Sequence, residues 1–149
     1  MAVQPYDEAE IIGEDTIIRR VPEHQLVWDD NGGQRRRRIS SALYAKSTGA
    51  QQGMSVEVEA LMLKHRVDPA NYVTSDEFPG AVAFSAAEIR ALDLMVGYDP
   101  IKDDPALPDN PYHGEVWRKT EARQFTGAQK NGLRDAARWY VQIEGVELK

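Results

Sequence analysis

The sequence contains no cysteine. This absence excludes disulfide frameworks, zinc fingers, other thiolate metal sites and cysteine nucleophiles, and it is compatible with a reducing compartment. No apolar run approaches the ~18 residues of a membrane-spanning helix, and the first residues are acidic, unlike the basic start of a signal peptide. We therefore expect a cytoplasmic protein that has no membrane partner.

Several motifs with a known chemistry are also absent. The sequence has no phosphate-binding loop, no dinucleotide fingerprint, no His-Glu-x-x-His pair and no Gly-x-Ser-x-Gly elbow. Four aspartates, Asp99, Asp103, Asp104 and Asp109, lack the spacing of an EF-hand loop. We expect neither a metal site nor a bound cofactor.

The 149 residues carry a net charge of −6, but acids and bases alternate in blocks along the chain. Residues 1–31 hold eight acids and two bases, and residues 67–115 hold ten acids and two bases. Residues 32–66 hold seven bases and two acids, and residues 116–149 hold seven bases and four acids. Two interpretations follow. The blocks pair with one another across the folded surface, or the basic blocks form a face for nucleic acid or an acidic protein partner.

The length favours one domain. Short apolar or alternating runs predict strands at 16–21, 39–44, 54–59, 80–84 and 112–117. We predict an α+β fold in which residues 16–149 form a single domain of four or five short strands with two or three helices on one face. The polar, acidic residues 1–15 are expected to form a flexible arm.

Two helix starts have the spacing of a capping box, Ser85 with Glu88 and Thr126 with Gln129. The second predicts a long C-terminal helix, because apolar residues recur at helical spacing. This apolar stripe comprises Leu133, Ala136, Ala137, Tyr140 and Val141. Lys130, Arg134 and Arg138 lie on the opposite side of the helical wheel, beside Trp139, which the arm is expected to cover.

The run Arg35–Arg38 places four guanidinium groups side by side, which is unfavourable unless they are solvated or paired with anions. In an extended chain, alternate arginines point to opposite faces. The run therefore either pairs internally with Asp29 and Asp30, or Arg35–Arg38 contact the phosphates of a nucleotide or nucleic acid. Arg36 and Arg38 are the candidate binding residues of the run.

A serine pair, Ser40 and Ser41, follows the arginine run directly. A serine nucleophile needs a base, and His113 is the best-placed histidine because it lies in a proline-rich loop beside Glu115. We expect one polar site built from Arg38, Ser40, Ser41 and His113, which requires the strand that carries Ser40 to lie beside the His113 strand.

The order of three segments is familiar: 38–44 (Arg-Ile-Ser-Ser-Ala-Leu-Tyr), 54–56 (Met-Ser-Val) and 108–113 (Pro-Asp-Asn-Pro-Tyr-His). It resembles a widespread group of small uncharacterised bacterial proteins with the pattern Arg-x-Ser-Ser-x-x-aromatic, then Ser-Val, then Pro-x-x-Pro-x-His. The resemblance spans roughly residues 17–141. It implies an intracellular domain of bacterial or phage origin, without a particular activity.

A second resemblance is to ADP-ribosyltransferase-like folds. Those folds place an arginine on a first strand, a hydroxyl cluster on a second and a glutamate late in the chain. On this scheme the three positions would be taken by Arg20, by Ser40 and Ser41, and by Glu115.

Two functions of different classes therefore remain open. The first is a small interaction or ligand-binding protein with a polar Arg/Ser/His site, whose partner is another protein. The second is an enzyme that acts on a nucleotide or nucleic acid, by ADP-ribosyl transfer or by hydrolysis. The candidate catalytic residues are His113, Ser41 and Glu115. The candidate binding residues are Arg20, Arg36, Arg38, Ser40, Ser41, Lys130, Arg134 and Arg138.

Overall fold

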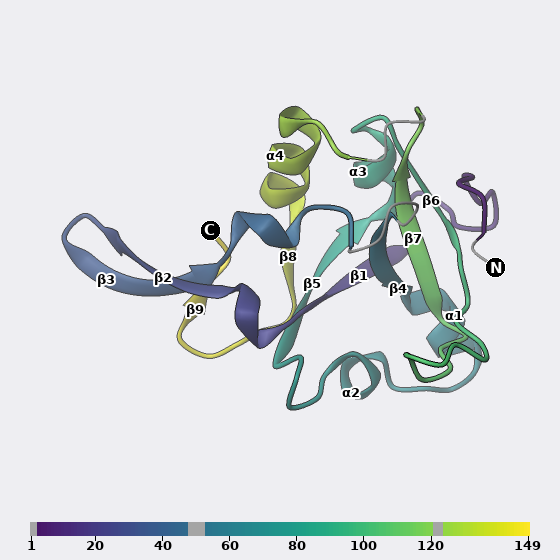
Figure 1. Ribbon diagram of the computed structural model, residues 1–149, viewed down its shortest axis with the longest axis horizontal. Coiled ribbons are helices and arrows are strands. Elements are labelled where there is room, and N and C mark those ends of the chain that lie inside the picture. Colours follow the sequence, from purple (N-terminus) through teal and green to yellow (C-terminus); the bar gives the residue numbers. More distant parts are fainter. Residues whose placement is uncertain (1–2, 48–52, 121–123) are drawn as a thin grey trace.

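A computed structural model describes residues 3–47, 53–120 and 124–149, and within these ranges it contains nine strands and four short α-helices (Figure 1). The strands are β1 (Thr16–Val21), β2 (Leu26–Asn31), β3 (Gln34–Ile39), β4 (Met54–Val58), β5 (Gly80–Ser85), β6 (Leu94–Tyr98), β7 (His113–Arg118), β8 (Arg138–Val141) and β9 (Val146–Glu147). The helices are α1 (Glu59–Lys64), α2 (Pro69–Val73), α3 (Ala86–Arg90) and α4 (Gly127–Ala136), with 3-10 turns η1 (Glu23–Gln25) and η2 (Ser41–Leu43).

Six of these strands form an antiparallel sheet in the order β6-β7-β4-β1-β5-β8. Strand β1 pairs with β5 along its whole length, from Thr16 opposite Ser85 to Val21 opposite Gly80. It pairs with β4 only through Ile17 and Ile18, so the two strands separate beyond that point. Beyond these pairs, the Arg19 side chain donates to the Ser55 carbonyl of β4.

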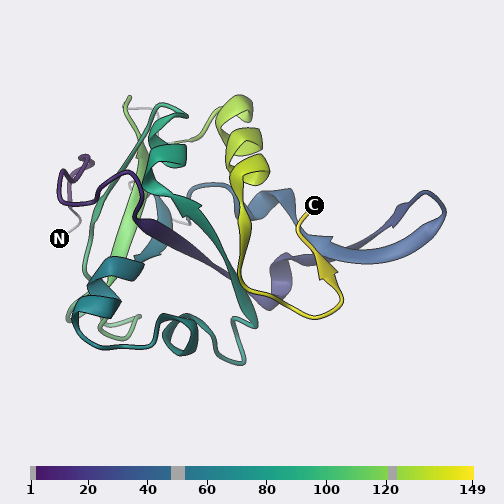
Figure 2. The same ribbon diagram turned by 180° about the vertical axis from the view of Figure 1, so that it is seen from behind.

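The sheet is covered on both faces, because successive side chains of each strand point to opposite sides. On one face, Ile17, Val82 and Phe84 form a core with Ile89 of α3 and Leu133 of α4. On the other, Ile18 and Ala81 pack with residues of α1 and α2. Figures 1 and 2 show α3 and α4 on one side and α2 on the other.

The prediction of an α+β fold with four or five strands and helices on one face is therefore wrong. The described residues are mostly sheet, with nine strands, and helices cover both faces of the large sheet. The prediction missed β2, β3, β6, β8 and β9, although β6 is an apolar run, Leu-Met-Val-Gly-Tyr. Strand β3 is largely arginine, β2 ends in Asp-Asp-Asn, and β9 has two residues.

Strands β2 and β3 form a hairpin that projects from the body of the molecule (Figures 1 and 2). Gly32 and Gly33 make its two-residue turn with φ of 61° and 85°, a conformation that glycine adopts without a steric penalty. Strand β9 adds to β3 in parallel and completes a three-stranded sheet. The arginine run is thus itself a strand, not the lead into one.

The predicted strand at 39–44 is wrong, since β3 ends at Ile39. Ser40 instead caps η2, and its hydroxyl accepts a hydrogen bond from the amide of Ala42 at 3.1 Å. Serine competes well for such local hydrogen bonds, which favour a turn over a strand. This change of direction carries Ser40 and Ser41 away from β7.

Both predicted capping boxes are confirmed, at Ser85 with Glu88 and at Thr126 with Gln129. The long C-terminal helix is not. Helix α4 ends at Ala136, and residues 138–141 form β8 on the free edge of β5. Aromatic and β-branched residues at 139–141 suit a strand, and the neighbouring edge supplies backbone partners.

The N-terminal segment, residues 3–15 of the predicted arm, lies along the edge strand β6. Asp7 accepts a hydrogen bond from the amide of Val96, and the amide of Glu8 donates to the Val96 carbonyl. The Ile11 side chain is 1% exposed and belongs to the core. The segment therefore lies at the opposite edge of the large sheet from β8 and its Trp139, contrary to the expectation that it covers that residue.

None of the helices in the described ranges has the length and apolar character that crossing a membrane requires.

Candidate functional site

The structure distributes the predicted site residues over three separate places. Arg20, His113 and Glu115 lie on one polar face of the large sheet. Ser41, Lys130 and Arg134 line a cavity of about 290 Å³ between η2 and α4, on the α4 side of the sheet. The expected single site of Arg38, Ser40, Ser41 and His113 is not formed, because β3 belongs to the other sheet.

The third place is the hairpin, where most of the arginine run is paired internally. Arg36 and Arg38 donate to the two carboxylate oxygens of Asp29 at 2.8 and 2.6 Å. Arg36 also pairs with Glu147 at 2.8 Å. Because these hydrogen bonds stabilise the charged form, they hold the pKa of Asp29 below its usual value. The geometry favours internal pairing over phosphate contact for Arg36 and Arg38.

Arg138, on β8, also has a partner within the fold. Its Nη1 donates to Glu88 at 3.1 Å, so it does not continue the basic row of α4.

A cleft of about 480 Å³ lies on the α1 and α2 side of the large sheet. Its floor is the polar part of that face, where β4 and β7 present alternating side chains. Ser55 lies opposite Glu115 and Glu57 lies opposite His113 across the strand pair. Directly opposed side chains on one face of an antiparallel pair are in contact range, so these four polar groups form one cluster.

Arg19 spans the gap where β1 and β4 separate. Its Nη1 donates to the Ser55 carbonyl at 2.8 Å, and its Nε donates to the Leu43 carbonyl at 3.3 Å. Burial lowers the pKa of Arg19 to about 10, while the Glu115 carboxylate acts to raise it. The guanidinium group therefore stays charged at neutral pH and sets a positive charge near Glu115.

Glu115 is 2% exposed and lies between Ser55 and His113. Its Oε1 is 3.5 Å from the Ser55 hydroxyl and 3.7 Å from Nε2 of His113. Burial, followed by the charge of Asp99, raises the pKa of Glu115 to about 8. Half of these carboxyl groups are thus protonated at mildly alkaline pH.

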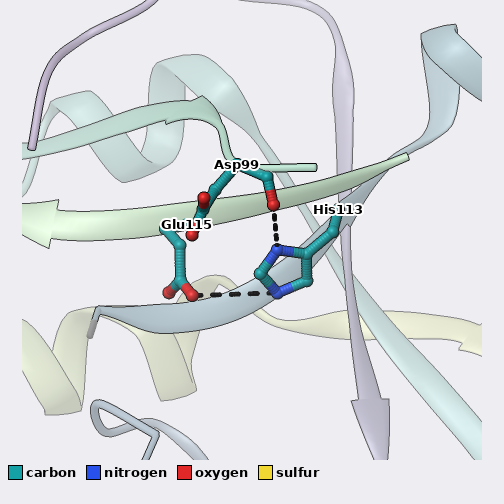
Figure 3. A group of neighbouring side chains, drawn as sticks. All are labelled: Asp99, His113 and Glu115. Atoms are coloured by element: carbon teal, nitrogen blue, oxygen red, sulfur yellow. Dashed lines mark hydrogen bonds and ion pairs between the residues drawn. The ribbon is translucent and has the colours of Figure 1, made fainter. Parts of the chain in front are cut away.

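His113 is held in one tautomer by the backbone of Asp99 (Figure 3). Its Nδ1 lies 2.7 Å from the Asp99 carbonyl, which can only accept, so Nδ1 carries a hydrogen. In the neutral ring, the lone pair is then on Nε2, which faces Glu115. The two side chains lie 3.7 Å apart at these atoms.

Asp99, His113 and Glu115 also offer side-chain atoms of the kinds that bind divalent cations, all within 4.8 Å of one another. This grouping was not expected from the spacing of the aspartates. The positive charge beside Glu115 is nevertheless already supplied by Arg19.

The lining of the cleft also contains a second network, around Glu57. Both carboxylate oxygens of Glu57 accept hydrogen bonds from Asn110, at 3.1 and 2.9 Å, and Nε of Arg20 lies 3.5 Å away. The Arg20 guanidinium lies between the rings of Tyr72 and Phe78, with 5.4 Å to each centroid. Arg20 is thereby positioned by two aromatic contacts and a carboxylate.

Sequence reasoning assigned no site role to Arg19, Ser55, Glu57 or the aromatic walls of the cleft. The signal for the serine and the glutamate was present, since Met54–Val58 alternates apolar and polar side chains. Because both faces of this strand are covered, its polar side chains, Ser55 and Glu57, are enclosed by the fold and become candidate site residues. Tyr72 and Phe78 had no such signal, because α2 and the following loop reach the cleft only through the tertiary fold.

Comparisons of the chain with family models, with curated proteins and with solved structures find no match.

Proposed function

We propose that the protein is an ADP-ribosyltransferase-like enzyme, which binds a nicotinamide dinucleotide in the cleft and breaks its N-glycosidic bond. One observation carries the proposal: Arg19, Ser55 and Glu115 come from three strands of one sheet, β1, β4 and β7. Arg19 donates to the backbone carbonyl of Ser55, the Ser55 hydroxyl lies 3.5 Å from Glu115, and the charges of Arg19 and Glu115 act on each other. The resemblance seen in the sequence names this set of an arginine, a hydroxyl and a late glutamate. The structure supports it with Ser55 in place of Ser40 and Ser41, and with Arg19 beside Arg20.

The cleft contains groups that suit each part of such a ligand. Arg19 and Arg20 both line it and supply positive charge for a pyrophosphate. Tyr72 and Phe78 supply aromatic surface for a base or a nicotinamide ring. The cleft volume of about 480 Å³ lies within the range that is usual for small-molecule binding sites.

Ser55 and His113 line the cleft, and Glu115 lies directly beneath them. When the N-glycosidic bond breaks, its electron pair leaves with nicotinamide, and positive charge develops at the ribose carbon and ring oxygen. A carboxylate fixed in a low-dielectric site stabilises that charge. Water then forms the new carbon–oxygen bond and loses a proton, which His113 Nε2 accepts as a base that lines the cleft.

The chain would use water as the acceptor of the ADP-ribosyl group when no other acceptor is present. A protein or nucleic-acid partner would compete with water for the same group. We also propose that the protein is cytoplasmic, because a chain without cysteine is compatible with a reducing compartment.

The experiment is incubation of the full chain with NAD⁺ and chromatographic separation of nicotinamide and ADP-ribose. We expect both products in equal amounts, and a loss of at least about a hundred-fold in rate for Glu115→Gln. Asp135→Asn, an exposed acid on α4, is the matched control and should keep the wild-type rate.

Two results would overturn the enzyme proposal. The first is no nicotinamide release while NAD⁺ still raises the melting temperature, which would assign the cleft to ligand binding alone. The second is release that persists at the wild-type rate in Glu115→Gln.

A further inference from the structure

The cavity between η2 and α4 is separate from the cleft and lies on the other face of the large sheet. Its polar lining consists of Ser41, Lys130, Asn131 and Arg134, and the remaining lining residues are two alanines and Gly127. No carboxylate is among them. A cavity with two basic side chains and no acid has a positive potential.

The charges in this cavity are not balanced from within the described part of the chain. Lys130 and Arg134 make no ion pair there. The Nε of Arg134 is buried and has no hydrogen-bond partner. Its neighbour inside the fold is the Tyr44 hydroxyl, which is also buried and unpartnered and offers no negative charge at neutral pH.

This arrangement costs free energy in the absence of a ligand. Lys130 and Arg134 are four residues apart on α4, so their like charges lie on one face of the helix and repel. A buried donor without a partner adds a further cost. Two other arginines of the described residues, Arg20 and Arg37, also have a buried Nε without a hydrogen-bond partner, but each of those side chains pairs with a carboxylate.

We propose that this cavity binds a phosphate group, which Lys130 and Arg134 contact through their charged ends and Ser41 and Asn131 through neutral donors. A phosphate group offers three or more acceptor oxygens and a charge near −2, so it satisfies all four donors at once. Arginine forms paired hydrogen bonds with such oxygens, and lysine contacts them as a point charge. The cavity does not depend on the cleft or on cleavage of NAD⁺.

The test is an NMR titration of ¹⁵N-labelled full chain with inorganic phosphate, and separately with O-phosphoserine and adenosine 5′-monophosphate. Sodium chloride at matched ionic strength controls for screening. We expect saturable shifts at the amides of 127–134 with phosphate and not with chloride. The three probes distinguish free phosphate from a phosphorylated amino acid and from a nucleotide.

The variants Lys130→Gln and Arg134→Gln should each weaken phosphate binding by about ten-fold or more, because each removes a charge-assisted hydrogen bond. Arg138→Gln is the matched control and should bind within about two-fold of wild type. Arg134→Lys keeps the charge and should lose less than Arg134→Gln, which separates the effect from misfolding. Wild-type affinity in both glutamine variants, no saturable shift at 127–134, or shifts confined to the cleft would overturn the proposal.

Discussion

At the scale of single residues, the burial of Glu115 makes both stability and the proposed activity depend on pH. Its carboxyl group is buried among Ser55, His113 and Arg19. Removing a carboxylate from water favours its neutral form, and here that effect exceeds the opposing charge of Arg19. The folded protein therefore holds this proton more tightly than the unfolded chain does.

We predict that the protein loses stability as pH rises from about 5 to 8. The pKa of Glu115 is about 8 in the fold against 4.5 in a free chain. In that window the folded state binds more protons than the unfolded state, so the free energy of unfolding falls by up to about 1.4 kcal/mol per pH unit. Urea denaturation at several pH values measures it. Glu115→Gln should flatten the slope, and an unchanged slope would contradict this origin.

Activity should change in the opposite direction over the same range. The proposed reaction needs the ionised carboxylate, and that form becomes the majority only above about pH 8. The value of kcat/KM for NAD⁺ cleavage should therefore rise about ten-fold per pH unit below 8 and level off above it, because it reports the free enzyme. If kcat/KM stays constant or falls between pH 6 and 9, the reaction does not depend on the ionised carboxylate of Glu115.

Residue identity alone indicated His113 and Glu115, but not the serine that joins them. Ser40 and Ser41 attracted attention because they follow four arginines, yet Ser40 is a turn cap and Ser41 lies on the other side of the sheet. Ser55 stood in an ordinary alternating strand. Its role depends on which strand lies beside β4, and a single sequence does not contain that pairing.

At the scale of elements, capping chemistry was a reliable guide and helical periodicity was not. A capping box is a local property of four residues, so both were found in the structure. The stripe that predicted a helix to Val141 combines two elements, because Leu133 and Ala136 belong to α4 and Tyr140 and Val141 to β8. Residues 138–141 gain the backbone hydrogen bonds of β5, which outweigh their weak helix preference.

Helix α4 should depend on one core contact. Leu133 is fully buried against the large sheet, so Leu133→Ala should cost about 2–5 kcal/mol of the free energy of unfolding through lost contact and a residual cavity. Asp135→Ala is the comparison on the same helix. It removes one exposed ion pair with Lys149 and should cost less than about 1 kcal/mol. Chemical denaturation of both variants gives the two values, and equal costs would contradict the assigned packing.

At the scale of the whole molecule, the N-terminal segment protects an edge of the large sheet. Strand β6 is an edge strand, and its backbone groups would otherwise face solvent or another chain. The Val96 amide donates to the Asp7 carboxylate at 3.1 Å, and the Tyr98 amide donates to the Tyr6 hydroxyl at 3.0 Å. Side chains of the segment thus replace a seventh strand. Acidic composition suggested a solvated arm, because composition does not show that these acceptors meet backbone donors.

The same segment contains a natural pair of positions with which to test this packing. Ile11 is 1% exposed and lies in the core, whereas Ile12, its neighbour, is 52% exposed. Ile11→Ala should lower the free energy of unfolding by about 2–5 kcal/mol, and Ile12→Ala should change it by less than about 0.5 kcal/mol. The two substitutions remove the same atoms, so a difference in the free energy of unfolding between them arises from the different burial of the two side chains. Thermal and urea melts of the full chain compare them directly. If the segment were a freely moving arm, the two variants would be equally stable, and both would match the wild type.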